Sequence, residues 1–313
     1  MDFMFRIMPI SQFINNTMKM NELSKNQTIK GITTFLTITF SLSSIFYFLI
    51  LNFGANSGEF RPYSQGLMWC PAVAAFLTLK IYGRKVSQLG WNWGSTRLQL
   101  MSYGIPLTYS LVTYLIIWIT GLGGFYKVEF VHSMTHSLGW SDISPHLSIL
   151  FYFVLIGIVG MIDFSAYALG EEIGWRGFLV PELYKISGFT KTALITGVIW
   201  SLWHYPLIIF SSYNNGTPLW YGLTCFTIMI ISSCFIYTWM RIKSNSLWTG
   251  VFLHGSHNLF IQRIFTPLTS DTGNTAYFID EFGMGLSIAS IIAGFIFWRK
   301  RHQLNSVFVR SEK

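Results

Sequence analysis

Long runs of apolar residues, separated by short polar stretches, follow one another along almost the whole chain. Several of these runs reach the roughly 20 residues that an α-helix needs to cross the hydrocarbon core of a bilayer. The pattern predicts membrane-spanning helices near residues 32–53, 64–81, 98–120, 147–171, 190–211, 218–240, 246–263 and 280–298. The expected fold class is therefore all-α, a bundle of about eight transmembrane helices.

The composition agrees with a membrane protein and excludes an ordinary soluble domain. Hydrophobic residues make up 51% of the 313 positions, and charged residues make up only 11%. Soluble domains carry charge at about a quarter of their positions. The low charge content indicates a polytopic membrane protein and argues against a soluble enzyme with a single anchor.

Lysine and arginine are unevenly divided between the two sides of the predicted bundle. If the N-terminus lies in the cytoplasm, all 21 basic residues except Arg61, Lys127 and Arg263 fall on the cytoplasmic side. Cytoplasmic loops attract lysine and arginine, so both termini are expected to be cytoplasmic. The net charge of +8 then reflects this bias at the lipid bilayer and requires no nucleic-acid partner.

A few ionisable residues interrupt the apolar runs, and residues of this kind inside a membrane are usually functional. Glu171 and Glu172 close the fourth run. On a helix, adjacent residues point about 100° apart, so both glutamates cannot face one site equally. Arg176 follows Glu172 by four residues, the favourable order for a helical ion pair. We therefore expect Arg176 to neutralise Glu172 and leave Glu171 facing the interior.

Histidines in two later runs offer further polar groups to the same interior. His204 lies in the fifth run, and His254 and Asn258 lie four residues apart in the seventh, which places them on one helical face. His257 is rotated by about 60° from His254, so it either shares this face or lines its edge.

A carboxylate, two imidazoles and an amide from separate helices fit the hydrolysis of a peptide bond. A carboxylate bonded to a histidine can take a proton from water, and a second histidine with an amide can donate to a developing oxyanion. The same groups also fit a zinc site with one open position. In that alternative the ligands are Glu171, His204 and His254.

Three short motifs, in this order, resemble those of the CPBP family, which includes CAAX prenyl protease 2, bacteriocin-processing and abortive-infection proteins. The stretch "EEIGWR" matches E-E-x-x-x-R, and "HGSHN" matches H-x-x-x-N. The stretch "WSLWH" resembles F-x-x-x-H, with Trp200 in place of the phenylalanine. The resemblance covers roughly residues 148–262, and the first three predicted helices show no matching motif.

The resemblance implies an intramembrane endopeptidase with an all-helical core. Carried over to this chain, Glu171 and His204 would activate the water, and His254 and Asn258 would hold the oxyanion. The family has been described both as metalloproteases and as metal-free glutamate proteases. We expect no cofactor here, with zinc as the alternative.

Two features of the chain depart from the family pattern. Trp200 replaces a phenylalanine, a change that is expected to matter little for packing. His257 is an additional imidazole beside Asn258, which keeps the zinc alternative open. Glu172 and Arg176 are expected to support the site without taking part in the chemistry.

The motifs divide the chain into four expected parts. These are a cytoplasmic N-terminal segment (1–31), the first three transmembrane helices (32–145), the catalytic core (146–265), and the last transmembrane helix with a basic cytoplasmic tail (266–313).

The expected location is a bacterial cell membrane, with the active site opening toward the cytoplasm. The expected partners are a peptide or membrane-protein substrate and the lipid bilayer. The alternative function is a non-catalytic membrane immunity or binding protein, which would not need the complete set of Glu171, His204, His254 and Asn258.

Overall fold

The computed structural model describes residues 10–54, 60–211 and 213–304, with side chains from residue 22 onward except at positions 60 and 61. It is 83% helical, so the all-α fold class is confirmed. The two chain ends, whose cytoplasmic location is expected from the basic residues, extend into residues 1–9 and 305–313 and lie outside the described residues.

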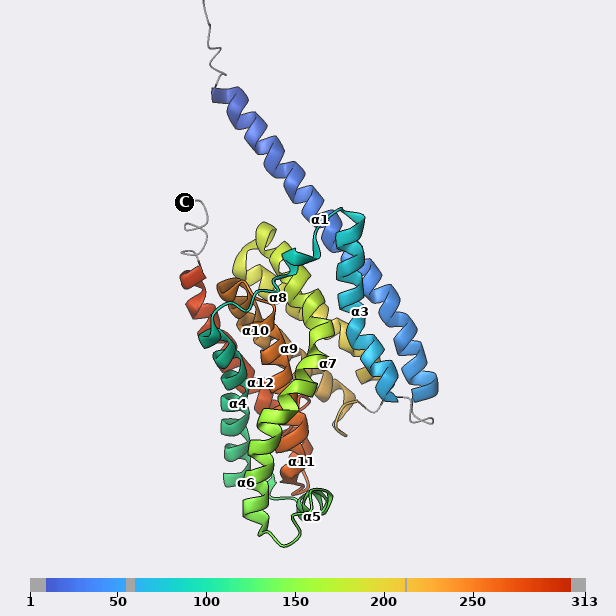
Figure 1. Cartoon of the computed structure of the whole chain (residues 1–313), viewed down its shortest axis with the longest axis vertical. Helices are drawn as coiled ribbons and strands as arrows, with labels where there is room; N and C mark the ends of the chain where they lie inside the picture. The colour runs from blue at the N-terminus through green and yellow to red at the C-terminus, as the bar shows by residue number, and fades with distance from the viewer. Residues whose placement is uncertain (1–9, 55–59, 212, 305–313) are drawn as a thin grey trace, which may run out of the picture.

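The first half of the chain forms three long helices that flank the bundle (Figure 1). They and their short extensions are α1 (Ile10–Leu49), η1 (Ile50–Gly54), α3 (Phe60–Ile81), η2 (Val86–Leu89) and α4 (Thr96–Ile119). The first expected span, 32–53, lies inside a longer helix, since α1 begins at Ile10 and its first turns project away from the bundle. Helix α3 packs along the bundle part of α1.

The end of the bundle farthest from the start of α1 carries small elements that the apolar pattern did not predict. Strand β1 (Gly124–Phe125) pairs antiparallel with β2 (Thr269–Ser270), and the short helix α5 (Val128–Ser137) lies at the same end. Each strand has only two residues, too few for an alternating pattern to be visible in the sequence.

The helix that carries the two glutamates does not end where the fourth run was expected to end. Helical structure continues without a loop through α6 (Pro145–Leu155), η3 (Ile156–Gly160), α7 (Met161–Glu172), η4 (Ile173–Leu179) and α8 (Val180–Phe210). The expected boundary near Glu171 is therefore wrong. The chain turns at Gly188, whose φ of 70° and ψ of 179° are readily adopted only by glycine.

The last part of the chain places one helix at the centre of the bundle. The elements are α9 (Leu219–Ser244), α10 (Trp248–Asn258), η5 (Leu259–Phe265), α11 (Thr266–Leu268), η6 (Thr275–Tyr277), α12 (Met284–Arg299) and η7 (Lys300–Leu304). Helix α10 packs against α4, α7 and α9. The last long helix begins at Met284 and not at residue 280, so residues 280–283 belong to the preceding loop.

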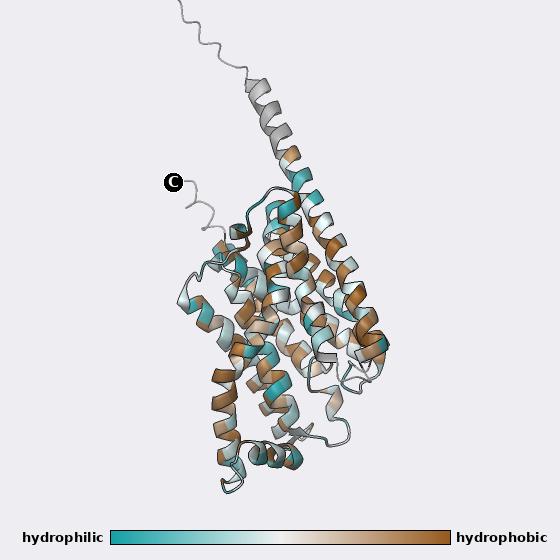
Figure 2. Ribbon diagram, turned by 45° about the vertical axis from the view of Figure 1, so that its right-hand side comes forward, coloured by the Kyte–Doolittle hydropathy of each residue, from teal (hydrophilic) through white to brown (hydrophobic). Residues whose placement is uncertain are grey.

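The outer surface of the bundle is apolar, as expected for a protein that spans a membrane. Large hydrophobic side chains are exposed along the helices, among them Phe48, Ile119, Ile158, Phe210 and Ile292, and Figure 2 shows the apolar residues along the outer helices. Soluble monomers rarely expose so many large apolar side chains together.

Four helical segments of the described chain are long and apolar enough to cross a bilayer: Glu22–Gly54, Thr96–Ile119, Pro145–Phe210 and Leu219–Ser244. The third has 66 residues and covers the fourth expected span and all but the last residue of the fifth. The protein is therefore an integral membrane protein. The count of eight spans stays a prediction.

Glycines allow α3 to approach the glutamate-bearing segment closely. A methyl group on Gly174 would lie 2.4 Å from Cβ of Pro71, and one on Gly170 would lie 2.7 Å from the backbone oxygen of Met68. Both distances are far below van der Waals contact. The glycines on either side of the two glutamates, Gly170 and Gly174, thus allow this segment to pack directly against the backbone of α3.

The expected topology can be tested with reporter fusions. Because the basic residues collect on one side, a fluorescent protein fused to the C-terminus should fold in the cytoplasm and fluoresce. Alkaline phosphatase inserted in the outer loop at Asp142 should be active. Phosphatase activity of a C-terminal fusion would show that the predicted orientation is wrong.

Candidate active site

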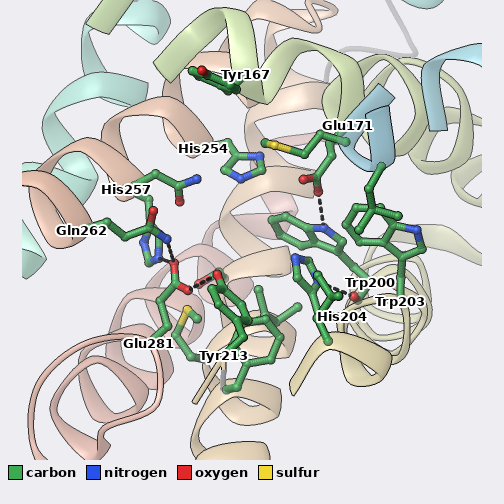
Figure 3. Close-up of a pocket in the computed structure, with 18 of the residues that line it drawn as sticks. Tyr167, Glu171, Trp200, Trp203, His204, Tyr213, His254, His257, Gln262 and Glu281 are labelled. Atoms are coloured by element: carbon green, nitrogen blue, oxygen red, sulfur yellow. Dashed lines mark hydrogen bonds and ion pairs between the residues drawn. The ribbon is translucent and has the colours of Figure 1, made fainter. Parts of the chain in front are cut away.

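A cavity of about 260 Å³ lies inside the bundle, among α3, α7, α8, α9, α10, η5 and the loop before α12. Figure 3 shows the side chains that line it. Five residues singled out in the sequence are among them: Glu171, His204, His254, His257 and Asn258. The structure thus brings together groups from three separate helices.

Glu171 stands at the end of α7, buried against two tryptophans. Its Oε2 atom accepts a hydrogen bond from Nε1 of Trp200 at 2.8 Å and a longer one from Nε1 of Trp175 at 3.4 Å. The expectation that Trp200 matters little concerned packing only and missed this bond. A phenylalanine at this position has no N–H to offer, so the indole gives this chain an additional donor to the carboxylate.

The hydrogen bonding of His204 defines which of its two ring nitrogens carries the proton. Its Nδ1 atom lies 2.9 Å from the backbone oxygen of Trp200. A carbonyl oxygen only accepts, so Nδ1 carries the proton, and Nε2 of the neutral ring is a proton acceptor. Within the described part of the chain, no direct hydrogen bond joins His204 to Glu171. The two side chains lie on the same side of the cavity (Figure 3).

The expected pair between Glu172 and Arg176 is confirmed. Nη1 of Arg176 donates to Oε1 of Glu172 at 2.8 Å, and both side chains are fully buried. The guanidinium lies between two aromatic rings, with Cζ 4.1 Å from the centre of Trp200 and 3.8 Å from that of Tyr237. These rings line the cavity, whereas the ion pair lies behind them.

Glu172 has a second partner that the sequence did not indicate. The same Oε1 atom lies 3.0 Å from Nδ1 of His254, 82 positions along the chain. A carboxylate accepts, so Nδ1 of His254 carries a proton and Nε2 faces the cavity. Glu172 therefore holds the imidazole in one orientation, a role beyond the ion pair expected from the helical spacing.

Gly250, one turn before His254 on α10, leaves the space that Glu172 occupies. A methyl group at this position would lie 2.5 Å from Oε2 of Glu172 and 3.1 Å from Cγ of Arg176. Only a residue without a side chain allows α10 to pass this close to the buried ion pair.

Asn258 follows His254 by one helical turn and also lines the cavity. Its side-chain amide makes no hydrogen bond to any residue that the structure describes. Its N–H groups therefore remain available to a molecule in the cavity.

His257 is held from both sides by groups that no sequence motif indicated. Its Nδ1 atom forms a short hydrogen bond with the hydroxyl of Tyr109, and its Nε2 atom lies 3.2 Å from Oε1 of Glu281. Both ring nitrogens are thus engaged, and neither is directed to the other residues of the proposed catalytic set.

Glu281 is a second carboxylate of the cavity, and sequence reasoning missed it. Its Oε1 atom also accepts from Nε2 of Gln262 at 3.0 Å, and its Oε2 atom accepts from the hydroxyl of Tyr213 at 3.3 Å. Burial opposes ionisation, but the hydrogen bonds and charges around it, His257 first among them, hold the pKa of Glu281 below its ordinary value. The residue was missed because the predicted last helix began at 280, whereas residues 280–283 fold back toward the bundle as a loop.

The residues of the zinc alternative do not form a ligand set as arranged here. Within the described residues, no three histidine, cysteine, aspartate or glutamate side chains are grouped closely enough to hold one metal ion.

A comparison with known protein families shows which family the part of the chain that carries the three motifs resembles. Residues 142–260 match the family described as type II CAAX prenyl endopeptidase Rce1-like. The match includes all three motifs, so the resemblance read from them is confirmed.

One relative of known name aligns with about a third of this chain. CAAX prenyl protease 2 of Methanococcus maripaludis is 35% identical over 107 residues, which is 33% of this chain and 38% of the relative. The matched region thus spans well under half the length of that protein.

The packing at Gly250 leads to a stability prediction. Gly250→Ala should lower the free energy of unfolding by about 1–3 kcal/mol, the usual cost of overpacking, because the methyl group pushes against the Glu172 carboxylate. Thermal unfolding in detergent measures the effect. Gly104→Ala is the matched control, because it adds the same methyl group to α4 with no atom within 4 Å. Equal melting temperatures for the two variants would contradict the described contact.

Proposed function

We propose that the protein is a membrane-embedded endopeptidase of the CAAX protease type, which hydrolyses a peptide bond within this cavity. The observation that carries the proposal is the meeting of three groups around one cavity: Glu171, the acceptor nitrogen of His204, and the amide of Asn258, which has no hydrogen-bond partner among the described residues. The Rce1-like sequence of residues 142–260 supports the same reaction class.

Activation of water is assigned to Glu171 and His204. A water held between the two groups would lose its proton to one of them as its oxygen attacks the carbonyl carbon of the scissile bond. The carbonyl of Trp200 keeps Nε2 of His204 in the accepting state. The two indole N–H groups hold the Glu171 carboxylate in place.

Stabilisation of the oxyanion is assigned to Asn258 and His254. The amide of Asn258 donates directly. His254 donates from Nε2 only when its ring carries both protons, and the bonded carboxylate of Glu172 favours this charged form. As the tetrahedral intermediate collapses, the proton taken from water passes to the leaving amine, so the products are one carboxylic acid and one amine.

The cavity is proposed to open toward the cytoplasm or the inner leaflet, in keeping with the cytoplasmic orientation that the distribution of basic residues predicts. The proposed substrate is a peptide or a segment of a membrane protein. The proposed reaction requires no cofactor, so cleavage by the purified protein should persist in the presence of a chelator.

The proposal is tested by peptide cleavage with purified protein in lipid vesicles. Glu171→Gln keeps the shape of the side chain and its ability to accept from the two indoles, but removes the base. It should therefore abolish cleavage while the melting temperature stays unchanged. Glu129→Gln makes the same chemical change at an exposed position on α5 and should leave the rate as it is. Full activity of Glu171→Gln would end the protease interpretation and leave a binding function in its place.

Two further variants test the roles assigned to Trp200 and Asn258, by their cleavage rates in the same assay. Trp200→Phe removes one hydrogen bond to a charged group, worth about 1.5–3 kcal/mol, and should slow cleavage by about tenfold or more. Asn258→Ala removes one oxyanion donor and should slow it by about 10²–10³.

A further inference from the structure

A groove of about 770 Å³ lies between α4 and α12 on the outer surface of the bundle. It shares no lining residue with the catalytic cavity. The two helices are in contact and run in opposite directions, because Gly285 near the start of α12 lies against Thr113 and Ile117 near the end of α4. The residues that line the groove are almost all apolar.

Small residues on the two helices leave the space that forms the groove. Gly285, Ala289 and Ala293 follow one another at every fourth position of α12, and Gly104 lies on α4. A methyl group on Gly104 would meet no atom within 4 Å, so the space beside it is empty of protein. In a bilayer, a recess of this kind can be filled by a hydrocarbon chain.

Basic residues stand at the end of the groove that is expected to face the cytoplasm, where α4 begins and α12 ends (Figure 1). Arg97 precedes the lining residue Met101 by four positions, which places both on one face of α4. Nζ of Lys300 lies 5.0 Å from the ring centre of Phe297, a lining residue of α12. Within the described chain, neither cation forms an ion pair with a carboxylate.

An apolar groove with cations at one end matches a phospholipid with an anionic headgroup. A membrane-spanning helix could also pack against the small residues, but its apolar middle section would leave Arg97 and Lys300 without a partner. The rise along α4 from Arg97 to Tyr109 is about 18 Å, and one leaflet contributes roughly 15 Å of hydrocarbon. An acyl chain whose headgroup lies at the cations therefore reaches Tyr109.

Tyr109 connects the groove with the catalytic cavity. Its side chain lines the groove, and its hydroxyl forms the short hydrogen bond with Nδ1 of His257. His257 lines the cavity, where its Nε2 atom lies 3.2 Å from Oε1 of Glu281. A chain packed against the ring of Tyr109 therefore restrains the hydroxyl that holds His257.

We propose that the groove between α4 and α12 binds one anionic phospholipid, with its headgroup at Arg97 and Lys300 and one acyl chain against Tyr109. The bound lipid holds Tyr109 on His257 and so keeps this wall of the cavity in the arrangement described above. The lipid site stands without the peptidase function, whereas its effect on cleavage rests on that proposed function.

Binding is measured by native mass spectrometry of the purified protein. The protein in detergent is titrated with phosphatidylglycerol or with phosphatidylcholine that carries the same acyl chains. One phosphatidylglycerol should be retained with an affinity about tenfold or more above that for phosphatidylcholine, because each basic residue near a membrane surface contributes about fivefold. Equal retention of the two lipids would show non-specific contact only and would overturn the proposal.

Charge variants locate the headgroup. Arg97→Gln and Lys300→Gln should each lower the affinity for phosphatidylglycerol by about fivefold. Lys80→Gln is the matched control, because it removes the same charge from an exposed position at the end of α3, outside the groove. A loss of affinity in the control as large as in the two variants would contradict a headgroup site at the groove.

A filled groove locates the acyl chain. Ala289→Phe places a ring in the groove and should abolish the retention of phosphatidylglycerol. Ala166→Phe makes the same change at an exposed position of α7 and should leave retention unchanged. Undiminished retention in Ala289→Phe would show that the proposal is wrong. A protein dimer that Ala289→Phe dissociates would show that a helix of a second copy occupies the groove, and would likewise reject the lipid.

The effect on the cavity is measured by cleavage of a peptide without net charge, in vesicles of phosphatidylcholine with and without phosphatidylglycerol. The anionic lipid should raise kcat by about threefold or more, the usual value of one hydrogen bond. Tyr109→Phe keeps the ring but removes the hydroxyl, so it should retain the lipid and lose this dependence. A dependence that persists in Tyr109→Phe would overturn the link to His257. If the unmodified protein cleaves nothing in either lipid, the peptidase proposal fails, and a retained phosphatidylglycerol still supports the lipid site.

Discussion

The buried ion pair between Glu172 and Arg176 constrains the arrangement of the whole cavity. Both side chains are fully buried, and an ion left without its partner in such a place destabilises a protein by about 3–5 kcal/mol. The pair lies where four helices meet, because Glu172 also bonds His254 and the guanidinium of Arg176 stacks on Trp200 and Tyr237. Since Glu171 and Glu172 are adjacent on one helix, fixing the second glutamate turns the first toward the cavity.

Two segments that contribute residues to the site or to its ion pair have an unusual backbone. The segment Ile173–Leu179 is π-helical, and so is Leu259–Phe265 on the helix that carries the histidines. Wider turns of this kind are frequent at functional sites. The first segment carries Arg176, whose guanidinium lies between the rings of Trp200 and Tyr237. The second carries Gln262, which donates a hydrogen bond to the carboxylate of Glu281.

The parts of the site that could be predicted from sequence depend on short-range geometry. The pairing of Glu172 with Arg176, and the shared face of His254 and Asn258, follow from a spacing of four residues on a helix. The hydrophobic runs likewise located most of the long helices, because each run must be long enough for a bilayer.

The parts that were missed depend on contacts between segments far apart in the chain. The bond from Trp200 to Glu171 and the bond from His254 to Glu172 join different helices, and helical periodicity carries no information about such pairs. Glu281 lies in a loop that folds back to the cavity, and two adjacent acidic residues, Asp280 and Glu281, at the edge of an apolar run give no signal of that. The boundary near Glu171 was misplaced because the two glutamates end the apolar run, whereas the helical structure continues beyond them.

The most direct test of the proposed reaction is an experimental structure of Glu171→Gln, in lipid, with an uncleaved peptide bound. The proposal predicts that the scissile carbonyl oxygen lies about 3 Å from the amide nitrogen of Asn258. It also predicts a water molecule between Gln at position 171 and Nε2 of His204. A peptide bound outside the cavity, or with its carbonyl directed away from Asn258, would contradict the account.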